Sequence, residues 1–139
     1  MILVEFTLTG PALSLQTRNR VALRRWKLDV HAGARACLVR RAHAPEDVFF
    51  SIGDFRWTGN RPDTDNIIKP AQDALTGLVY DDDRQVRDTL GFTRANLAFV
   101  PITLGLLPAL QTGLVSGLPF VHVAVSTSAA PHFEGVVDA

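Results

Sequence analysis

The chain has 139 residues, 47% of them hydrophobic and 20% charged, which argues against disorder and leaves room for one domain with one core. Its single cysteine, Cys37, excludes an intrachain disulfide and a cysteine-clustered zinc site, and favours a reduced, cytoplasmic setting. The four histidines show no metal-ligand spacing. The net charge is zero, but residues 1–62 carry ten Lys/Arg against five Asp/Glu, whereas residues 63–88 carry three against seven. The zero total therefore conceals a basic half that can face a polyanion.

Alternating apolar residues predict a first strand over residues 1–9. Residues 17–30 predict a helix with one apolar and one basic stripe, formed by Ala22, Trp26 and Val30 and by Arg20, Arg24 and Lys27. Residues 47–57 predict a second strand with a bulge at Gly53-Asp54, followed by a loop.

A second helix is predicted to begin near Asp65, a residue type that caps helices well, and to end near Val79. Pro70 suits the first turn of a helix but not its interior, so the regular part is expected to start only at Lys69. Asp81 to Asp83 predict a turn.

A third strand is predicted near residues 85–92, and from Ala95 to Pro131 the chain has no charged residue. Prolines and glycines interrupt this segment well short of 18 continuous apolar residues, which favours an insert and a buried strand at 120–125 over a membrane span. The segment is also a candidate subunit interface. The element order β-α-β-α-β-insert-β predicts an α+β fold, with a mixed sheet and two main helices in one domain over residues 1–139.

The chemically informative segment is residues 62–86, PDTDNIIKPAQDALTGLVYDDDRQV. Asp63 and Asp65 stand two apart at a helix entrance, and Lys69 follows one turn later. Two carboxylates about 4 Å apart repel by about 4 kcal/mol at an effective dielectric near 20, so gathered acids need a divalent cation or must stay apart in water. Carboxylates without histidine or cysteine suit Mg²⁺ or Mn²⁺, which can activate water for attack on a phosphodiester. A nearby lysine can stabilise the developing charge.

The spacing alone also fits a purely structural interpretation. Asp63 and Asp65 belong to the residue types favoured in turns and near helix N-termini. Asp81 to Asp83 would then form a solvated turn, and Lys69 would be a surface charge paired with Asp73. The spacing by itself leaves both interpretations open.

The same string resembles the signature of the RusA-type Holliday junction resolvases, with four elements in order and matching gaps. The matching residues fall within about 25 of the 139 and are Asp63-Thr64-Asp65-Asn66, Lys69, Asp73-Ala74-Leu75 and Asp82-Asp83-Arg84-Gln85-Val86. The resemblance implies a homodimer that binds four-way DNA junctions and makes paired nicks with Mg²⁺ in DNA recombination and repair. It also implies a catalytic site made of Asp63, Asp65, Lys69 and Asp83, in which the three carboxylates bind metal and Asp82 is a further candidate ligand.

The basic residues have two interpretations, a solvated helix surface or contact with DNA phosphates. The acidic segment favours phosphate contact, for which the candidates are Arg18, Arg20, Arg24, Lys27, Arg56 and Arg61. Trp26 and Trp57 could stack on bases exposed at a junction, but packing in the core is favoured for both.

Three other functions stay open at this point. The first is a catalytically silent junction-binding protein of the same fold, in which the acids bind metal only for stability. The second is a metal-dependent phosphoesterase acting on small substrates, and the third is a membrane or assembly protein that uses residues 95–125. A resolvase would act in the cytoplasm, at the nucleoid when bound to DNA, and no protein partner beyond a second copy can be inferred.

Overall fold

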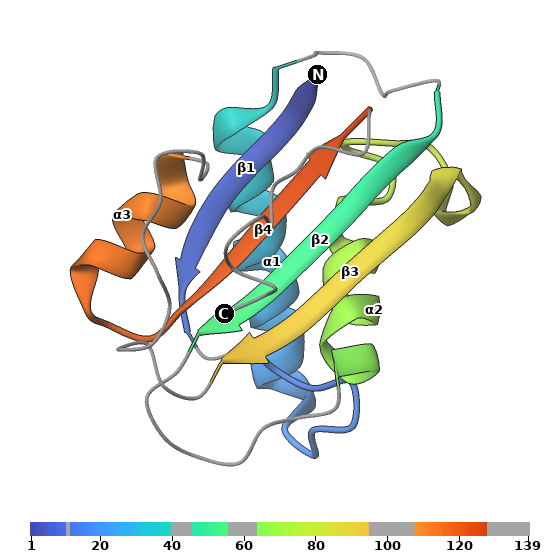
Figure 1. Ribbon diagram of the computed structural model, residues 1–139. Helices are drawn as coiled ribbons and strands as arrows, with labels where there is room; N and C mark the ends of the chain where they lie inside the picture. Colours follow the sequence, from blue (N-terminus) through green and yellow to red (C-terminus); the bar gives the residue numbers. More distant parts are fainter. Residues whose placement is uncertain (11, 40–45, 56–63, 95–107, 128–139) are drawn as a thin grey trace.

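A four-stranded mixed sheet forms the centre of the molecule, in the order β1-β4-β2-β3 (Figure 1). The computed structural model describes residues 1–10, 12–39, 46–55, 64–94 and 108–127. β4 pairs antiparallel with both β1 and β2, while β2 and β3 pair in parallel. The strands are β1 (Ile2–Thr9), β2 (Val48–Phe55), β3 (Val86–Arg94) and β4 (Phe120–Ser126).

Three α-helices and one 3₁₀ helix complete the described fold. The helices are α1 (Arg20–Cys37), α2 (Thr64–Leu75), α3 (Pro108–Ser116) and η1 (Asp83–Gln85). The predicted α+β class and element order are confirmed, and α3 occupies part of the predicted insert. In the described ranges no helix has the length and apolar character needed to span a membrane.

The main core lies between the sheet and the pair α1 and α2 (Figure 1). Side chains alternate between the two faces of a strand. Given the strand register, Val4, Phe50 and Val123 all point to the face of the sheet that carries the main core. These residues pack against the buried stripe of α1, which consists of Leu23, Trp26, Val30 and Ala34.

A smaller apolar cluster covers the opposite face of the sheet, against α3. The rings of Phe55 and Phe120 stack with centroids 4.6 Å apart, and Phe92 meets Phe55 edge-on at 5.4 Å. Leu110 and Leu114 of α3 complete this cluster. The segment 120–126 is therefore buried on both faces, as expected for a central strand.

A buried acid and base hold α3 to the sheet. Glu5 of β1 uses one carboxylate oxygen to accept a hydrogen bond from the Ala109 backbone N–H, at 2.9 Å in the first turn of α3. Its other oxygen lies 2.6 Å from Nε2 of His122, which is 1% exposed at its side chain. One carboxylate thus satisfies a free N–H at a helix start and a ring nitrogen of a buried histidine.

The first helix is longer than predicted. Asn19 caps it by accepting a hydrogen bond from the Ala22 N–H at 2.9 Å, and the helix continues to Cys37 rather than ending at residue 30. The apolar stripe continues through a small residue, Ala34, which is fully buried. Gly33 lies directly under Phe6, where a Cβ would be 2.6 Å from the ring. The helix thus continues beyond Val30 with small residues that fit beneath β1, so the pattern of large apolar residues does not reveal its full length.

The second helix begins at Thr64, next to the predicted start at Asp65, and ends at Leu75 rather than near Val79. It holds Pro70 in its interior. A proline lacks the N–H that would bond to the carbonyl four residues earlier, here that of Asn66. That carbonyl instead accepts a hydrogen bond from the Leu15 backbone N–H at 2.8 Å. The expectation that regular structure starts only at Lys69 is therefore wrong, because a partner outside the helix replaces the missing intrahelical donor.

Gly53 does not mark a bulge, contrary to the expectation from sequence. The register of β2 with β3 and β4 runs unbroken through Gly53 and Asp54. The glycine instead leaves room for a ring, since a Cβ at this position would lie 2.6 Å from Cζ of Phe92. The absence of a side chain at Gly53 is therefore a packing requirement of the smaller apolar cluster.

We expect Gly53→Ala to lower the free energy of unfolding by about 1–3 kcal/mol, because the new methyl group overpacks two rings of the cluster. Gly91→Ala is the matched control, since its Cβ would meet chiefly the flexible Cδ1 end of Ile68, at 2.7 Å. Its cost is expected to stay below about 1 kcal/mol. Urea unfolding curves measure both, and equal midpoints for the two variants would contradict the packing role of Gly53.

Candidate active site

Parallel pairing of β2 and β3 places α2 across these strands and returns the chain to the start of β3. The return segment is held against α2 by Tyr80, which is fully buried and donates its hydroxyl to the Gln72 carbonyl at 3.0 Å. The Gly77 N–H donates to the Tyr80 carbonyl at 2.7 Å. These contacts fix the turn that carries Asp81 to Asp83 beside the helix that carries Lys69.

Gln85 and Asp82 shape this turn from within. The Asp82 carboxylate accepts from the Arg84 backbone N–H at 2.9 Å and from its guanidinium at 3.1 Å. The Gln85 side chain accepts from the N–H groups of Asp81 and Asp82 and donates to the Glu46 carbonyl at 3.0 Å. Together they form a capping box at the start of η1.

Lys69 links the helix to this turn. Its ammonium group lies 3.1 Å from Oδ1 of Asp73 and 3.4 Å from Oδ2 of Asp83. Asp73 is one turn along the same helix, whereas Asp83 comes from η1. Lys69 thus links two carboxylates that are ten residues apart in the sequence, Asp73 and Asp83, which belong to different elements of the motif.

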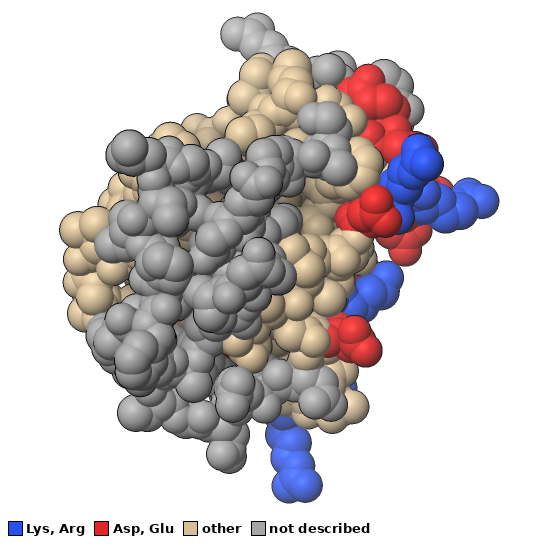
Figure 2. All heavy atoms as spheres, viewed as in Figure 1, with Lys and Arg blue, Asp and Glu red and all other residues tan. Residues whose placement is uncertain are grey.

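The other oxygen of Asp73 faces α1. Lys27 places its ammonium 3.8 Å from Oδ2 of Asp73, and about a third of each side chain is exposed. The chain of charges therefore runs from α1 through α2 to η1 at the molecular surface. Figure 2 shows acidic and basic side chains gathered along one edge of the molecule, where α2 and β3 lie in Figure 1.

The charges change the titration of their neighbours. Hydrogen bonding to Asp73 is the main cause that raises the pKa of Lys69, and Asp83 adds to it, so this ammonium group stays protonated at neutral pH. Burial raises the pKa of Tyr80, with a further contribution from the negative charges of Asp73 and Asp83. The tyrosine hydroxyl therefore serves as a hydrogen-bond donor within the turn.

Residues 40–100 match the family model described as endodeoxyribonuclease RusA. The ion-paired residues Lys69, Asp73, Asp83 and Lys27, here called the Lys69 network, all lie in this range except Lys27. This segment of the chain is therefore similar to the RusA family. A search of curated proteins found no match. The family implies a DNA endonuclease that resolves Holliday junctions, in agreement with the resemblance identified from the motif.

Within the matched segment, the structure assembles part of the predicted catalytic set. Lys69 and Asp83 are in contact, while Asp65 is exposed in the first turn of α2 and does not join their ion pairs. Asp63 lies outside the described residues. Among the residues that are described, no group of three or more His, Cys, Asp or Glu side chains is arranged to hold a metal ion.

The structural interpretation of the motif holds for some of its residues. Asp82 acts as a capping residue whose oxygens are engaged by Arg84, and Lys69 does pair with Asp73. The role of Gln85 was not recognised from the sequence, although Asp82-x-x-Gln85 has the spacing of a capping box. The contact between Lys27 and Asp73 had no sequence signal, because it depends on how two helices are aligned.

The predicted DNA-contact residues on α1 and just before it are mostly exposed. Arg18, Arg20 and Arg24 lie at the surface, and Arg20 donates to the Leu15 carbonyl at 3.0 Å. Leu15 in turn bonds to Asn66, so Arg20 stands near the start of α2. Two further candidates, Arg56 and Arg61, lie outside the described residues.

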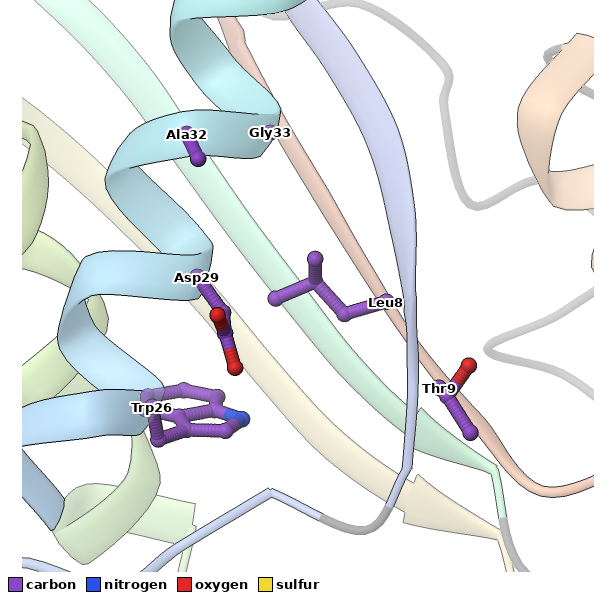
Figure 3. A pocket seen from close by; sticks show the side chains of 6 residues that line it. All are labelled: Leu8, Thr9, Trp26, Asp29, Ala32 and Gly33. Atoms are coloured by element: carbon purple, nitrogen blue, oxygen red, sulfur yellow. The ribbon is translucent and has the colours of Figure 1, made fainter. Parts of the chain in front are cut away.

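A separate cavity of about 460 Å³ lies between α1 and β1, and none of its lining residues belongs to the motif. Figure 3 shows Trp26 and Asp29 extending from α1 toward Leu8 and Thr9 of β1. Trp26 is 6% exposed, which confirms its predicted place in the core, whereas Trp57 lies outside the described residues. The cavity is distinct from the Lys69 network, which contacts the other side of α1 through Lys27.

The cap at Asp82 makes a prediction about acid stability. Hydrogen bonding from Arg84, first its backbone N–H and then its guanidinium, lowers the pKa of Asp82 from 3.8 to about 2 in the folded protein. The ionised cap therefore stabilises the fold above pH 3.8, and its contribution is lost as the pH falls toward 2.

We expect Asp82→Ala to be less stable than wild type at neutral pH, with a gap in urea midpoint that stays constant down to about pH 5 and then narrows. Unfolding curves taken from pH 7 to pH 2 measure this gap. Asp29→Ala, which removes an exposed carboxylate outside the turn, is the control. A gap that does not change with pH would contradict the ionic cap.

Proposed function

We propose that this protein is a Mg²⁺-dependent, structure-selective DNA endonuclease that resolves four-way junctions by paired phosphodiester hydrolysis, in DNA recombination and repair. The observation that carries the proposal is the contact between Lys69 and Asp83, 3.4 Å apart, within the segment that matches the RusA family. A lysine held beside an exposed carboxylate provides a cation where phosphoryl oxygens gain charge and an anion that can bind metal.

In this proposal Asp63, Asp65 and Asp83 hold the metal ion, either Mg²⁺ or Mn²⁺. The donor chemistry supports this assignment, because hard divalent cations prefer carboxylate oxygens. Asp82 is the least suited of the candidate ligands, since both of its oxygens accept hydrogen bonds from Arg84. When bound, the metal would polarise the phosphodiester and activate water.

Lys69 keeps its charge next to the reacting phosphate, and Asp73 keeps the lysine in place. The proposed substrate is a branched DNA. Its phosphates are contacted by Arg18 before α1, by Arg20, Arg24 and Lys27 on α1, and by Arg56 and Arg61, which precede α2 in the sequence. Paired nicks need two sites, so the proposal includes a homodimer. It also places the protein in the cytoplasm, at the nucleoid when it is bound to DNA.

A second candidate function is a catalytically silent protein that binds junctions. Among the described residues the acids form no group able to hold a metal, and Lys69 already neutralises part of the charge of Asp83. Such a protein would bind junctions tightly and leave them uncut in every divalent metal. Cleavage therefore separates the two functions.

The test is cleavage of a labelled four-way junction beside a linear duplex, with Mg²⁺ or with a chelator. We expect metal-dependent, symmetric nicking of the junction and a loss of roughly 100-fold or more in Asp65→Asn. Asp65 is exposed, so the isosteric change should leave the fold intact. Asp29→Asn is the matched control, because it removes an exposed carboxylate outside the motif. Nicking that survives chelation, or equal activity of both variants, would refute the proposed site.

A further inference from the structure

Two lysines from different helices share one carboxylate at the edge of the candidate site. Lys69 of α2 contacts Oδ1 of Asp73 at 3.1 Å, and Lys27 of α1 contacts Oδ2 at 3.8 Å. Each side chain of the trio is between 34% and 48% exposed, so the ammonium groups are accessible from solvent but partly shielded by protein. The two positive charges are thus held near each other by a single negative one.

The alignment of the helices creates this arrangement. Near their N-terminal ends, the Leu15 N–H bonds to the Asn66 carbonyl, and one to two turns later Lys27 reaches Asp73. α1 and α2 therefore run side by side in the same direction, and their facing charges meet in register. The basic stripe of α1, formed by Arg20, Arg24 and Lys27, follows this helix boundary toward the network.

Charge counting indicates what the pair is suited to bind. If Asp83 serves a metal ion, as the proposed function requires, Asp73 is the one counterion that Lys27 and Lys69 keep among the described residues. One positive charge then remains, and a phosphodiester carries one negative charge. Ammonium groups with several donors each are common partners of DNA phosphate oxygens.

We propose that Lys27 and Lys69, held together by Asp73, bind the backbone phosphate at the cleaved bond of the DNA strand, with Asp73 as the positioning residue. This inference rests on the proposed function for its substrate. It assigns Lys27, which lies outside the family-matched segment, to the same phosphate as Lys69. It also assigns Asp73 the task of keeping the two ammonium groups together.

The test compares Lys27→Ala with Arg25→Ala, which also removes one exposed positive charge from α1. Arg25 lies roughly 200° around the helix axis from Lys27, away from α2. Junction binding measured with Ca²⁺ in place of Mg²⁺, over a series of salt concentrations, is expected to weaken about fivefold in Lys27→Ala near 0.1 M salt. The slope of log K against log salt should fall by about one phosphate contact in this variant alone.

Lys27→Arg should restore most of the affinity, because it keeps the charge and the reach. A loss in Lys27→Ala that equals that of Arg25→Ala, with the same salt slope, would overturn the phosphate contact. Melting curves of all three variants separate this result from loss of fold.

The role of Asp73 is tested by single-turnover cleavage with Asp73→Asn and by a double-mutant cycle with Lys27→Ala in junction binding. We expect Asp73→Asn to lower the cleavage rate about tenfold, because Lys69 is no longer held in position. Junction affinity should stay unchanged or rise, because the variant loses a negative charge that repels the DNA phosphates. The effect of Lys27→Ala on binding should shrink in the Asp73→Asn background. Strictly additive effects would contradict a shared carboxylate.

Separate measurements of DNA binding and DNA cleavage keep the two proposals distinguishable. If wild type binds DNA without cutting it, the nuclease function fails, and the salt slope of Lys27→Ala still decides the phosphate contact. If wild type cuts junctions and Lys27→Ala matches Arg25→Ala, only the phosphate contact fails. If wild type binds no DNA, both proposals are overturned.

Discussion

The parallel pairing of β2 and β3 is the constraint on which the candidate site depends. Parallel neighbours cannot be joined by a tight turn, so the chain must cross the sheet as a helix before it returns. The crossing helix supplies Lys69, and the return segment supplies Asp83. Pro70 then leaves the Asn66 carbonyl to the Leu15 N–H, which ties α1 to the same helix. The parallel pairing and the missing N–H of Pro70 thus both contribute to placing charged residues of α1, α2 and η1 at one surface.

Electrostatic balance explains why so many charges can stand together at this surface. Lys69 is shared by two carboxylates, and one of these is shared again with Lys27. The acidic segment is thus partly compensated by a residue from the basic half, and the segregation of charge along the sequence is reversed in space. Exposed ion pairs contribute little to stability, so this arrangement matters for position and charge at the surface more than for the fold.

Much of the fold was predictable because alternation and stripes are local. The element order, the α+β class and the buried strand near residue 120 came from these patterns. The RusA-like motif contains Lys69 and Asp83, which the structure brings into contact. The regular helix before Lys69 was missed because the proline rule assumes that no donor from outside the helix exists, and the Leu15 N–H is one. The contact of Lys27 with Asp73 was missed because no sequence spacing encodes how two helices align. Asp63, Arg56 and Arg61 stay predictions.

The position of β4 has a consequence for how the chain reaches this fold. Residues 120–126 lie between β1 and β2, so residues 2–9 have no strand neighbour until nearly the whole described chain has been synthesised. The β2-α2-β3 crossover is local by comparison and can form while the chain is still emerging from the ribosome. Contacts of such long sequence separation slow folding, and the backbone edge of β1 that pairs with β4 stays open in the meantime. We therefore expect closing of the sheet, rather than assembly of the charged surface, to be the late step in folding.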